Sequence, residues 1–324
     1  MTGPIGNDTA RAAFARAVEG GALHHAWLIA GPEGVGKGSF ARHAAAVLLA
    51  RALDPALPAD APVSPDHRVA HLLASGAHPD YRELVRLPKD AAKPDDGLAR
   101  GITIAQVRAL QPMFATKPAL SERRVVVIDA IDDLERGASN ALLKNLEEPP
   151  VGTIFLLVSH APGRLLPTIR SRCRMLRFGA LSDAEVERVL ERQAPDASAQ
   201  ERAALARAGA GSPGRALAFA GLDMDEIDRE LALIADTGDV DNAARGRLRR
   251  QLSARGGQAR YAAFVERVPG FIAERARGAV GERLRTALNA HDDALRVGGI
   301  AMGLSLDIAG TVFELCGIVA RLSR

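Results

Sequence analysis

The stretch Ala26-Trp27-Leu28-Ile29-Ala30-Gly31-Pro32-Glu33-Gly34-Val35-Gly36-Lys37 decides the fold of the first half of this chain. Five apolar residues are followed by a glycine-rich turn and then by a pattern, 37–53, that is typical of a helix. A phosphate-binding loop requires this order of strand, turn and helix, because the glycines let main-chain N–H groups converge on phosphate oxygens. The nucleotide-binding residues predicted from this loop are Gly31, Gly34, Val35, Gly36, Lys37, Gly38 and Ser39.

Two further apolar runs rich in β-branched residues lie at 124–129 and 153–158, with helical patterns between them. This alternation indicates an α/β domain built on a buried, mostly parallel sheet. The first of the two runs ends on Asp129, where a Walker B aspartate would complete a metal site beside the loop. We therefore add Asp129 to the predicted nucleotide site.

The strand pattern disappears beyond residue 181. Ser182 and Glu185 form the capping box that begins a helix, and a Gly-Ser-Pro-Gly break at 211–214 divides the helical half. The domains predicted in this way are an α/β nucleotide-binding-like domain, 1–180, a small helical domain, 181–223, and a larger helical domain, 224–324.

The composition excludes several classes of protein. With 47% apolar and 25% charged residues and a net charge of +3, the chain has the make-up of a folded soluble protein. Aromatic residues make up only 4%, too few for a surface that stacks bases. The two cysteines, Cys173 and Cys316, cannot build a disulfide framework or a four-cysteine zinc site, so no zinc is expected. No apolar run reaches about 18 residues and no secretory signal is visible, so we expect a cytoplasmic protein without a membrane span.

Charge is distributed unevenly in the helical half. The segment 245–285 carries 11 arginines against three glutamates, whereas 223–241 carries eight acids and one arginine. Such runs usually form solvated helix faces, and a face for a partner or for nucleic acid remains the alternative.

The residues around Lys37 weaken the case for catalysis. A hydrolysing phosphate loop needs a Ser or Thr hydroxyl directly after its lysine to hold magnesium, and this chain has Gly38 there. Ser39 lies one residue farther on, about 100° around the helix, so it does not simply substitute. Ala130 stands where a glutamate would polarise the attacking water. We expect magnesium to be held poorly and the chain's own ATP hydrolysis to be weak or absent.

Several segments together resemble one family, and the match runs from about residue 20 to 178. They are 24–28 and 34–37 (HHAWL, GVGK), 76–80 (GAHPD), 104–108 (IAQVR), 139–150 (SNALLKNLEEPP) and 168–173 (TIRSRC). The sequence resembles the AAA+ subunits of the bacterial DNA polymerase III clamp loader. The resemblance implies an AAA+ module with a parallel sheet, then a helical lid over 181–223 and an all-α collar domain over 224–324 that serves oligomerisation.

The resemblance also implies roles for residues and partners. Arg172, in the Ser-Arg-Cys triplet, would be an arginine finger acting in trans on the ATP site of a neighbouring subunit. Ser159 would occupy the sensor 1 position, and ATP would be the nucleotide bound. The implied partners are gamma/tau and delta subunits in a hetero-oligomer, with the sliding clamp and primed DNA reached through the assembled complex. The expected place is the nucleoid-associated replisome.

Within this family, Gly38 and Ala130 favour the subunit type that lacks a competent ATPase site of its own. One alternative is a catalytically active ATPase of the gamma/tau type. A second is an active, stand-alone phosphate-loop ATPase in which Ser39 rescues the metal site. Another alternative is a protein that binds DNA directly through 245–285. Many family members also carry four cysteines between the loop helix and the His-Pro-Asp segment, whereas residues 51–80 here contain none.

Overall fold

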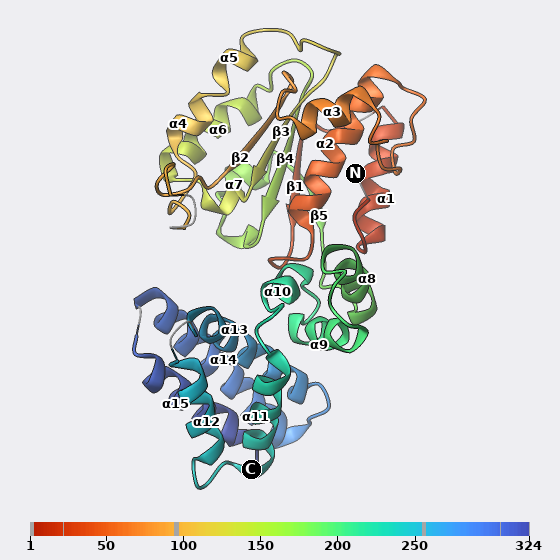
Figure 1. Ribbon diagram of the computed structural model, residues 1–324. Helices are drawn as coiled ribbons and strands as arrows, with labels where there is room; N and C mark the ends of the chain where they lie inside the picture. Colours follow the sequence, from red (N-terminus) through yellow and green to blue (C-terminus); the bar gives the residue numbers. More distant parts are fainter. Residues whose placement is uncertain (1–2, 22, 94–96, 255–256, 305, 324) are drawn as a thin grey trace. The chain divides into compact units, whose positions relative to one another are not determined.

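A computed structural model describes residues 3–21, 23–93, 97–254, 257–304 and 306–323. The chain forms two compact units, Met1–Leu181 and Ser182–Arg324 (Figure 1). A further boundary near residue 224, between a lid and a collar, remains a prediction.

Five parallel strands form a single sheet in the first unit, in the order β2-β3-β4-β1-β5 (Figure 1). The central strands are the three apolar runs predicted from the sequence, whereas the edge strands carry mixed exposure and were not singled out. The α/β class with a parallel sheet is confirmed. The strands are Ala26–Ala30 (β1), Tyr81–Val85 (β2), Arg124–Asp129 (β3), Thr153–Ser159 (β4) and Arg174–Arg177 (β5).

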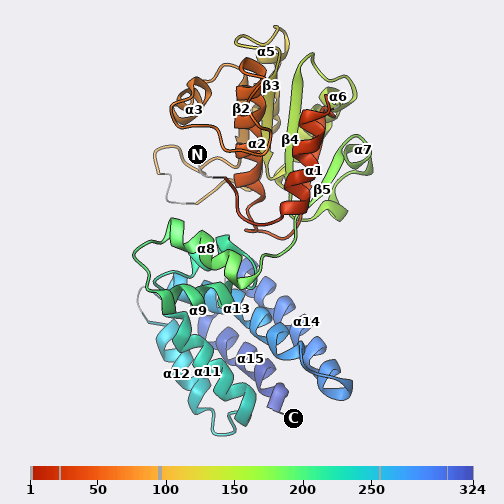
Figure 2. The same ribbon diagram turned by 90° about the vertical axis from the view of Figure 1, so that its right-hand side faces the viewer.

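Helices cover both faces of this sheet, as Figures 1 and 2 show. The predicted helix that follows the glycine-rich loop is confirmed as α2. The helices of the first unit are Asp8–Glu19 (α1), Lys37–Leu53 (α2), Arg68–Ala74 (α3), Ile104–Arg108 (α4), Gln111–Phe114 (α5), Arg136–Glu147 (α6) and Pro167–Arg170 (α7).

Alternate residues of the central strands supply two hydrophobic cores, one on each face of the sheet. Trp27 and Ile29 of β1 pack with α1, α2 and α3, while Leu28 lies in the core shared with α4, α6 and α7. A strand buried on both faces reads as a continuous apolar run, which explains why β1, β3 and β4 were visible in the sequence. The sheet is therefore a rigid platform for the loops at its ends.

The second unit is helical throughout the residues described. Its first helix begins as predicted, because Ser182 Oγ accepts a hydrogen bond from the Glu185 N–H and the Glu185 carboxylate accepts one from the Ser182 N–H at 2.8 Å. Within the described ranges, no helix has both the length and the apolar character to cross a membrane. The helices are Asp183–Gln193 (α8), Ala199–Gly209 (α9), Pro213–Ala218 (α10), Met224–Thr237 (α11), Ala243–Leu252 (α12), Gln258–Ala276 (α13), Gly281–Leu304 (α14) and Ile308–Val319 (α15).

The acidic run 223–241 and the arginine-rich run 245–285 pair with each other. Most of the acids lie on α11 and the turn after it, and the arginines that pair with them lie on α12 and α13. Figure 2 shows α11, α12 and α15 side by side. Arg255 and Gly256 lie outside the described residues. The ion pairs, at 2.6 to 2.9 Å, are Arg245–Asp239, Arg247–Glu230, Arg260–Glu226, Arg267–Asp228 and Arg275–Asp236. These five arginines are thus engaged inside the unit.

Candidate functional site

Three of the predicted segments meet at one edge of the sheet. Because parallel strands end on the same side, the loop after β1, Asp129 at the end of β3 and Ser159 at the end of β4 become neighbours. Ala30 pairs with Ser159, and Asp129 pairs with Val158 on the next strand. The Gly31 N–H donates to the Ser159 carbonyl at 3.2 Å, which ties the start of the loop to β4.

The loop has the backbone shape expected of a phosphate loop. Gly34 and Gly36 have φ angles of 74° and 94°, in the left-handed region that glycine adopts without strain. Gly36 directly precedes α2. Within the described part of the chain, the main-chain N–H groups of Gly36, Lys37 and Gly38 have no acceptor. Free N–H groups at the start of a helix favour an anion.

Lys37 is folded back onto its own loop. Its side chain is only 2% exposed, and its Nζ donates to the carbonyl oxygens of Gly31, at 2.8 Å, and Pro32. Burial lowers the pKa of Lys37 to about 8, although Asp129 and Glu33 act in the opposite direction. The ammonium group therefore lies within the loop, where it could contact a bound phosphate.

Gly38 lies against the carboxylate of Asp129. A Cβ atom at Gly38 would clash with Asp129 Oδ2, and it would also come within 3.1 Å of Arg42 Nη2. In this arrangement, a larger side chain at position 38, such as the one that holds magnesium in a hydrolysing loop, would fit only if the Asp129 carboxylate moved. Burial raises the pKa of Asp129, and the neighbouring Arg42 partly offsets this effect.

Arg42 is the residue that the sequence reasoning missed. Its Nη1 lies 2.5 Å from Glu83 Oε1 and 3.5 Å from Asp129 Oδ2. Tyr81 donates its hydroxyl to the other oxygen of Glu83 at 2.9 Å, and burial raises the pKa of Tyr81, so the phenol stays a donor. The sequence feature that could have indicated Arg42 is its spacing from Gly38, because residues four apart lie on the same face of a helix.

The residues at this edge do not fit a magnesium ion. Gly38 offers no hydroxyl, Ser39 is exposed and is not a partner of Asp129, and the Asp129 carboxylate already faces the Arg42 guanidinium. Magnesium prefers several oxygen ligands, and a cationic side chain at the remaining carboxylate opposes it.

Ser159 is fully buried, and its hydroxyl is engaged. It donates to Asp132 Oδ1 at 2.9 Å, and the same carboxylate accepts the main-chain N–H groups of His160 and Ala161 at 2.7 and 3.1 Å. Asp132 thus holds the turn after β4 in place. The sensor 1 role of Ser159 remains a prediction.

Arg172 lies just beyond α7, and its side chain is about one third exposed. One guanidinium nitrogen lies 2.8 Å from Glu147 Oε1, at the end of α6, and another donates to the Thr168 carbonyl at 2.8 Å. The 139–150 and 168–173 segments, quoted separately in the sequence analysis, therefore meet at this ion pair. No pattern in the sequence indicates that Glu147 is the partner of Arg172.

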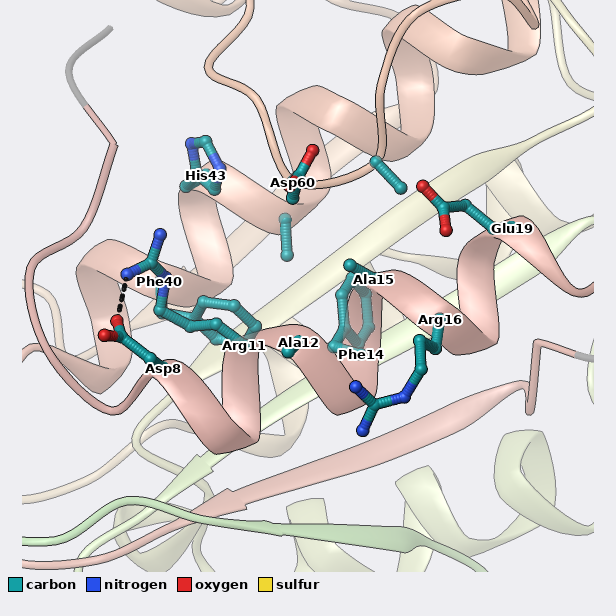
Figure 3. A pocket seen from close by; sticks show the side chains of 12 residues that line it. Asp8, Arg11, Ala12, Phe14, Ala15, Arg16, Glu19, Phe40, His43 and Asp60 are labelled. Carbon is teal, nitrogen blue, oxygen red and sulfur yellow. Dashed lines mark hydrogen bonds and ion pairs between the residues drawn. The ribbon is translucent and has the colours of Figure 1, made fainter.

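A cavity of about 320 Å³ lies elsewhere in the first unit, between α1, α2 and the turn at residues 59–60 (Figure 3). Arg11 and Asp8 form a 2.8 Å ion pair at its rim. It includes none of the predicted site residues. Its lining consists of Asp8, Arg11, Ala12, Phe14, Ala15, Arg16, Glu19, Phe40, His43, Ala44, Ala59 and Asp60.

Comparison with known proteins bears on the whole first unit. Residues 6–182 match the family model described as DNA polymerase III, delta subunit. The chain is 39% identical over 189 residues to the DNA polymerase III subunit delta' of Pseudomonas aeruginosa, covering 58% of this chain and 53% of that protein. It is 36% identical over 170 residues to the delta' subunit of Bacillus subtilis, covering 52% of this chain and 46% of that protein.

A more distant similarity extends to the gamma/tau subunit of Mycobacterium tuberculosis, at 31% identity over 239 residues, 72% of this chain and 37% of that protein. The chain spans about half the length of the delta' relatives it matches. The identity to the delta' relatives, 39% and 36%, is higher than the identity to the gamma/tau relative, 31%. The chain therefore belongs to the DNA polymerase III, delta subunit family, and within it to the delta-prime subunits of the clamp loader.

Proposed function

We propose that this chain is an architectural subunit of the clamp loader, which assembles with gamma/tau and delta subunits and hydrolyses little or no ATP itself. In the DNA polymerase III holoenzyme it would take part in the ATP-driven loading of the sliding clamp on primed DNA. The main support for the proposal is that Gly38 offers no ligand to magnesium and that Arg42 faces the Asp129 carboxylate. Membership of the delta-prime group supports it.

The chain's contribution to chemistry would be Arg172, as an arginine finger for the ATP site of a neighbouring subunit. A guanidinium is permanently charged and planar, so it can stabilise negative charge that develops on a transferred phosphoryl group. Arg172 is partly exposed, and its guanidinium is held beside α7 by Glu147 and the Thr168 carbonyl. Surface ion pairs of this kind are weak, so the pair can open at an interface.

The loop itself would hold the phosphates of a nucleotide, with ATP as the candidate. The free N–H groups of Gly36, Lys37 and Gly38 and the buried Lys37 ammonium support this role. Binding would require Lys37 to exchange the Gly31 and Pro32 carbonyls for phosphate oxygens. Asp129 and Ser159 would border the site without a metal between them.

The finger is tested by the Arg172→Ala variant in a loader reconstituted from all subunits. Because arginine fingers contribute about 10³-fold or more to turnover, we expect DNA-stimulated ATPase to fall at least about tenfold even where several sites share the work. Arg170→Ala is the matched control, since Arg170 is an exposed arginine two residues away. Equal ATPase and clamp loading for the Arg172 variant and the wild type would contradict the assignment.

The isolated chain provides the second arm of the test. We expect no significant ATP turnover with magnesium. Turnover of about 1 s⁻¹ or faster, abolished by Lys37→Ala, would instead support an active ATPase of the gamma/tau type.

A further inference from the structure

The cluster around Asp129 brings together three elements. Arg42 comes from α2, Glu83 from β2 and Asp129 from β3. Val85 pairs with Asp129 in the β2–β3 register, so Glu83, two residues before it, projects to the same face of the sheet as Asp129. Two carboxylates thus stand on the face that α2 covers, and the guanidinium of Arg42 lies between them at 2.5 and 3.5 Å.

Gly38 and Arg42 are linked by this packing. A Cβ at position 38 would meet both the Asp129 carboxylate and the Arg42 guanidinium, so their present approach to each other depends on the space that the glycine leaves. The absence of the magnesium-binding hydroxyl and the presence of a cationic side chain are therefore two parts of one arrangement.

The charge of the cluster matches this arrangement. Two carboxylates on one sheet face are the kind of ligands that magnesium or manganese takes, and without a cation they would repel each other. The guanidinium supplies one permanent positive charge and a planar set of donors that suits carboxylates. Tyr81 completes the cluster by donating to Glu83.

We propose that Arg42 is a resident cation that occupies the place of magnesium in this phosphate loop, so that the chain binds no divalent cation at Asp129. The proposal does not depend on the loader function, because it concerns the isolated chain. It means that any nucleotide held by the loop is held without metal, and that removal of the guanidinium uncovers a latent metal site made of Glu83 and Asp129.

The test is Mn²⁺ binding to the full chain, measured from the electron paramagnetic resonance signal of the free ion. The wild type is expected to bind Mn²⁺ only in the millimolar range, and Arg42→Ala is expected to bind it at least about tenfold more tightly. Arg42→Lys, which keeps the positive charge, and the double variant Arg42→Ala, Asp129→Asn are both expected to return to the wild-type affinity.

Arg86→Ala is the matched control. Arg86 forms a similar pair with Asp133 at 3.2 Å, and its side chain is 40% exposed against 44% for Arg42. This variant should gain no Mn²⁺ affinity, because only one carboxylate is uncovered.

Two results would overturn the proposal. One is micromolar Mn²⁺ binding by the wild type that Asp129→Asn removes, and this measurement is decisive even without the Arg42 variants. The other is a folded Arg42→Ala or Arg42→Gln variant, judged by circular dichroism, that binds Mn²⁺ no more tightly than the wild type.

Discussion

At the scale of one residue, Lys37 is a charged side chain whose burial in the loop is energetically unfavourable. The ammonium group donates to two main-chain carbonyls and is almost fully buried. Burial is the main reason that its pKa is lowered from 10.5 to about 8. Since the unfolded state keeps the ordinary value, it binds more protons than the folded state between these two pH values. The lysine therefore lowers the stability of the free loop at neutral pH.

This predicts a pH-dependent difference between the wild type and Lys37→Met. The unfolding free energy of the wild type should rise relative to that of the variant from about pH 8 to about pH 10.5, by about 3 kcal/mol at most. Urea unfolding at a series of pH values measures it. A difference that stays constant over this range would show that the lysine is not buried as described.

Gly38 makes a second prediction at the residue scale. Gly38→Ala should lower the free energy of unfolding by about 1–3 kcal/mol, because the new methyl group overlaps the Asp129 carboxylate, which must shift, and crowds Arg42. Gly137→Ala in α6 is the control, since a Cβ there meets Ile104 at an ordinary 3.5 Å and helix propensity improves. Urea midpoints of the two variants provide the comparison. Equal stability of both variants would contradict the close approach at Gly38.

At the scale of elements, hydrogen bonds to Asp80 connect the beginning of β2 with the segment that leads into β3. Its side chain is 2% exposed and accepts the main-chain N–H groups of Ala119 and Leu120 at 2.7 and 2.9 Å. The GAHPD segment, quoted in the sequence analysis only for its family resemblance, therefore has a structural role at its aspartate. It sets β2, and with it Glu83, next to β3.

Asp80→Ala should destabilise the first unit by about 3 kcal/mol, because two N–H groups lose a charged acceptor. Asp90→Ala removes a similar cap from the Ala92 N–H on an exposed turn and should cost less than about 1 kcal/mol. Chemical denaturation followed by the fluorescence of Trp27, which is buried in the same unit, measures both. A cost for Asp80→Ala no larger than that of the control would refute the structural role of Asp80.

At the scale of the whole molecule, the chain divides into two compact units, and we expect one thermal transition for each. Arg267 is 2% exposed and binds both Asp228 and Glu274, so it joins α11 to α13 and braces α13 within the second unit. Arg275 forms a comparable but exposed pair with Asp236.

Arg267→Ala should lower only the transition of the second unit, with a loss of about 3 kcal/mol, because two carboxylates lose their partner in a partly buried place. Arg275→Ala should cost less than about 1 kcal/mol. Differential scanning calorimetry of the full chain distinguishes the transitions. A shift of both transitions together on Arg267→Ala would show that the units unfold as one.

Prediction from sequence succeeded where the pattern is local. The central strands, α2 and the capping box at Ser182 follow from residues close together in the chain, since apolar runs, glycine turns and caps act over a few positions. The edge strands β2 and β5 were not predicted, because they are only partly buried and their residues do not form a continuous apolar run. The ion pairs between the acidic run and the arginine-rich run were not predicted, because they form only when α11 packs against α12 and α13.

The sequence by itself predicted a phosphate loop, determined that Gly38 stands where a hydroxyl would hold magnesium, and placed Arg172 in a Ser-Arg-Cys triplet. Only the tertiary structure decided which side chain lies beside Asp129 and which residue contacts Arg172. Arg42 meets Glu83 and Asp129 through the order of the sheet, and Arg172 meets Glu147 through the packing of α6 against α7. These contacts join residues 25 to 87 positions apart, and no local propensity specifies them, because the sheet register and the burial of both faces must first bring the strands and helices together.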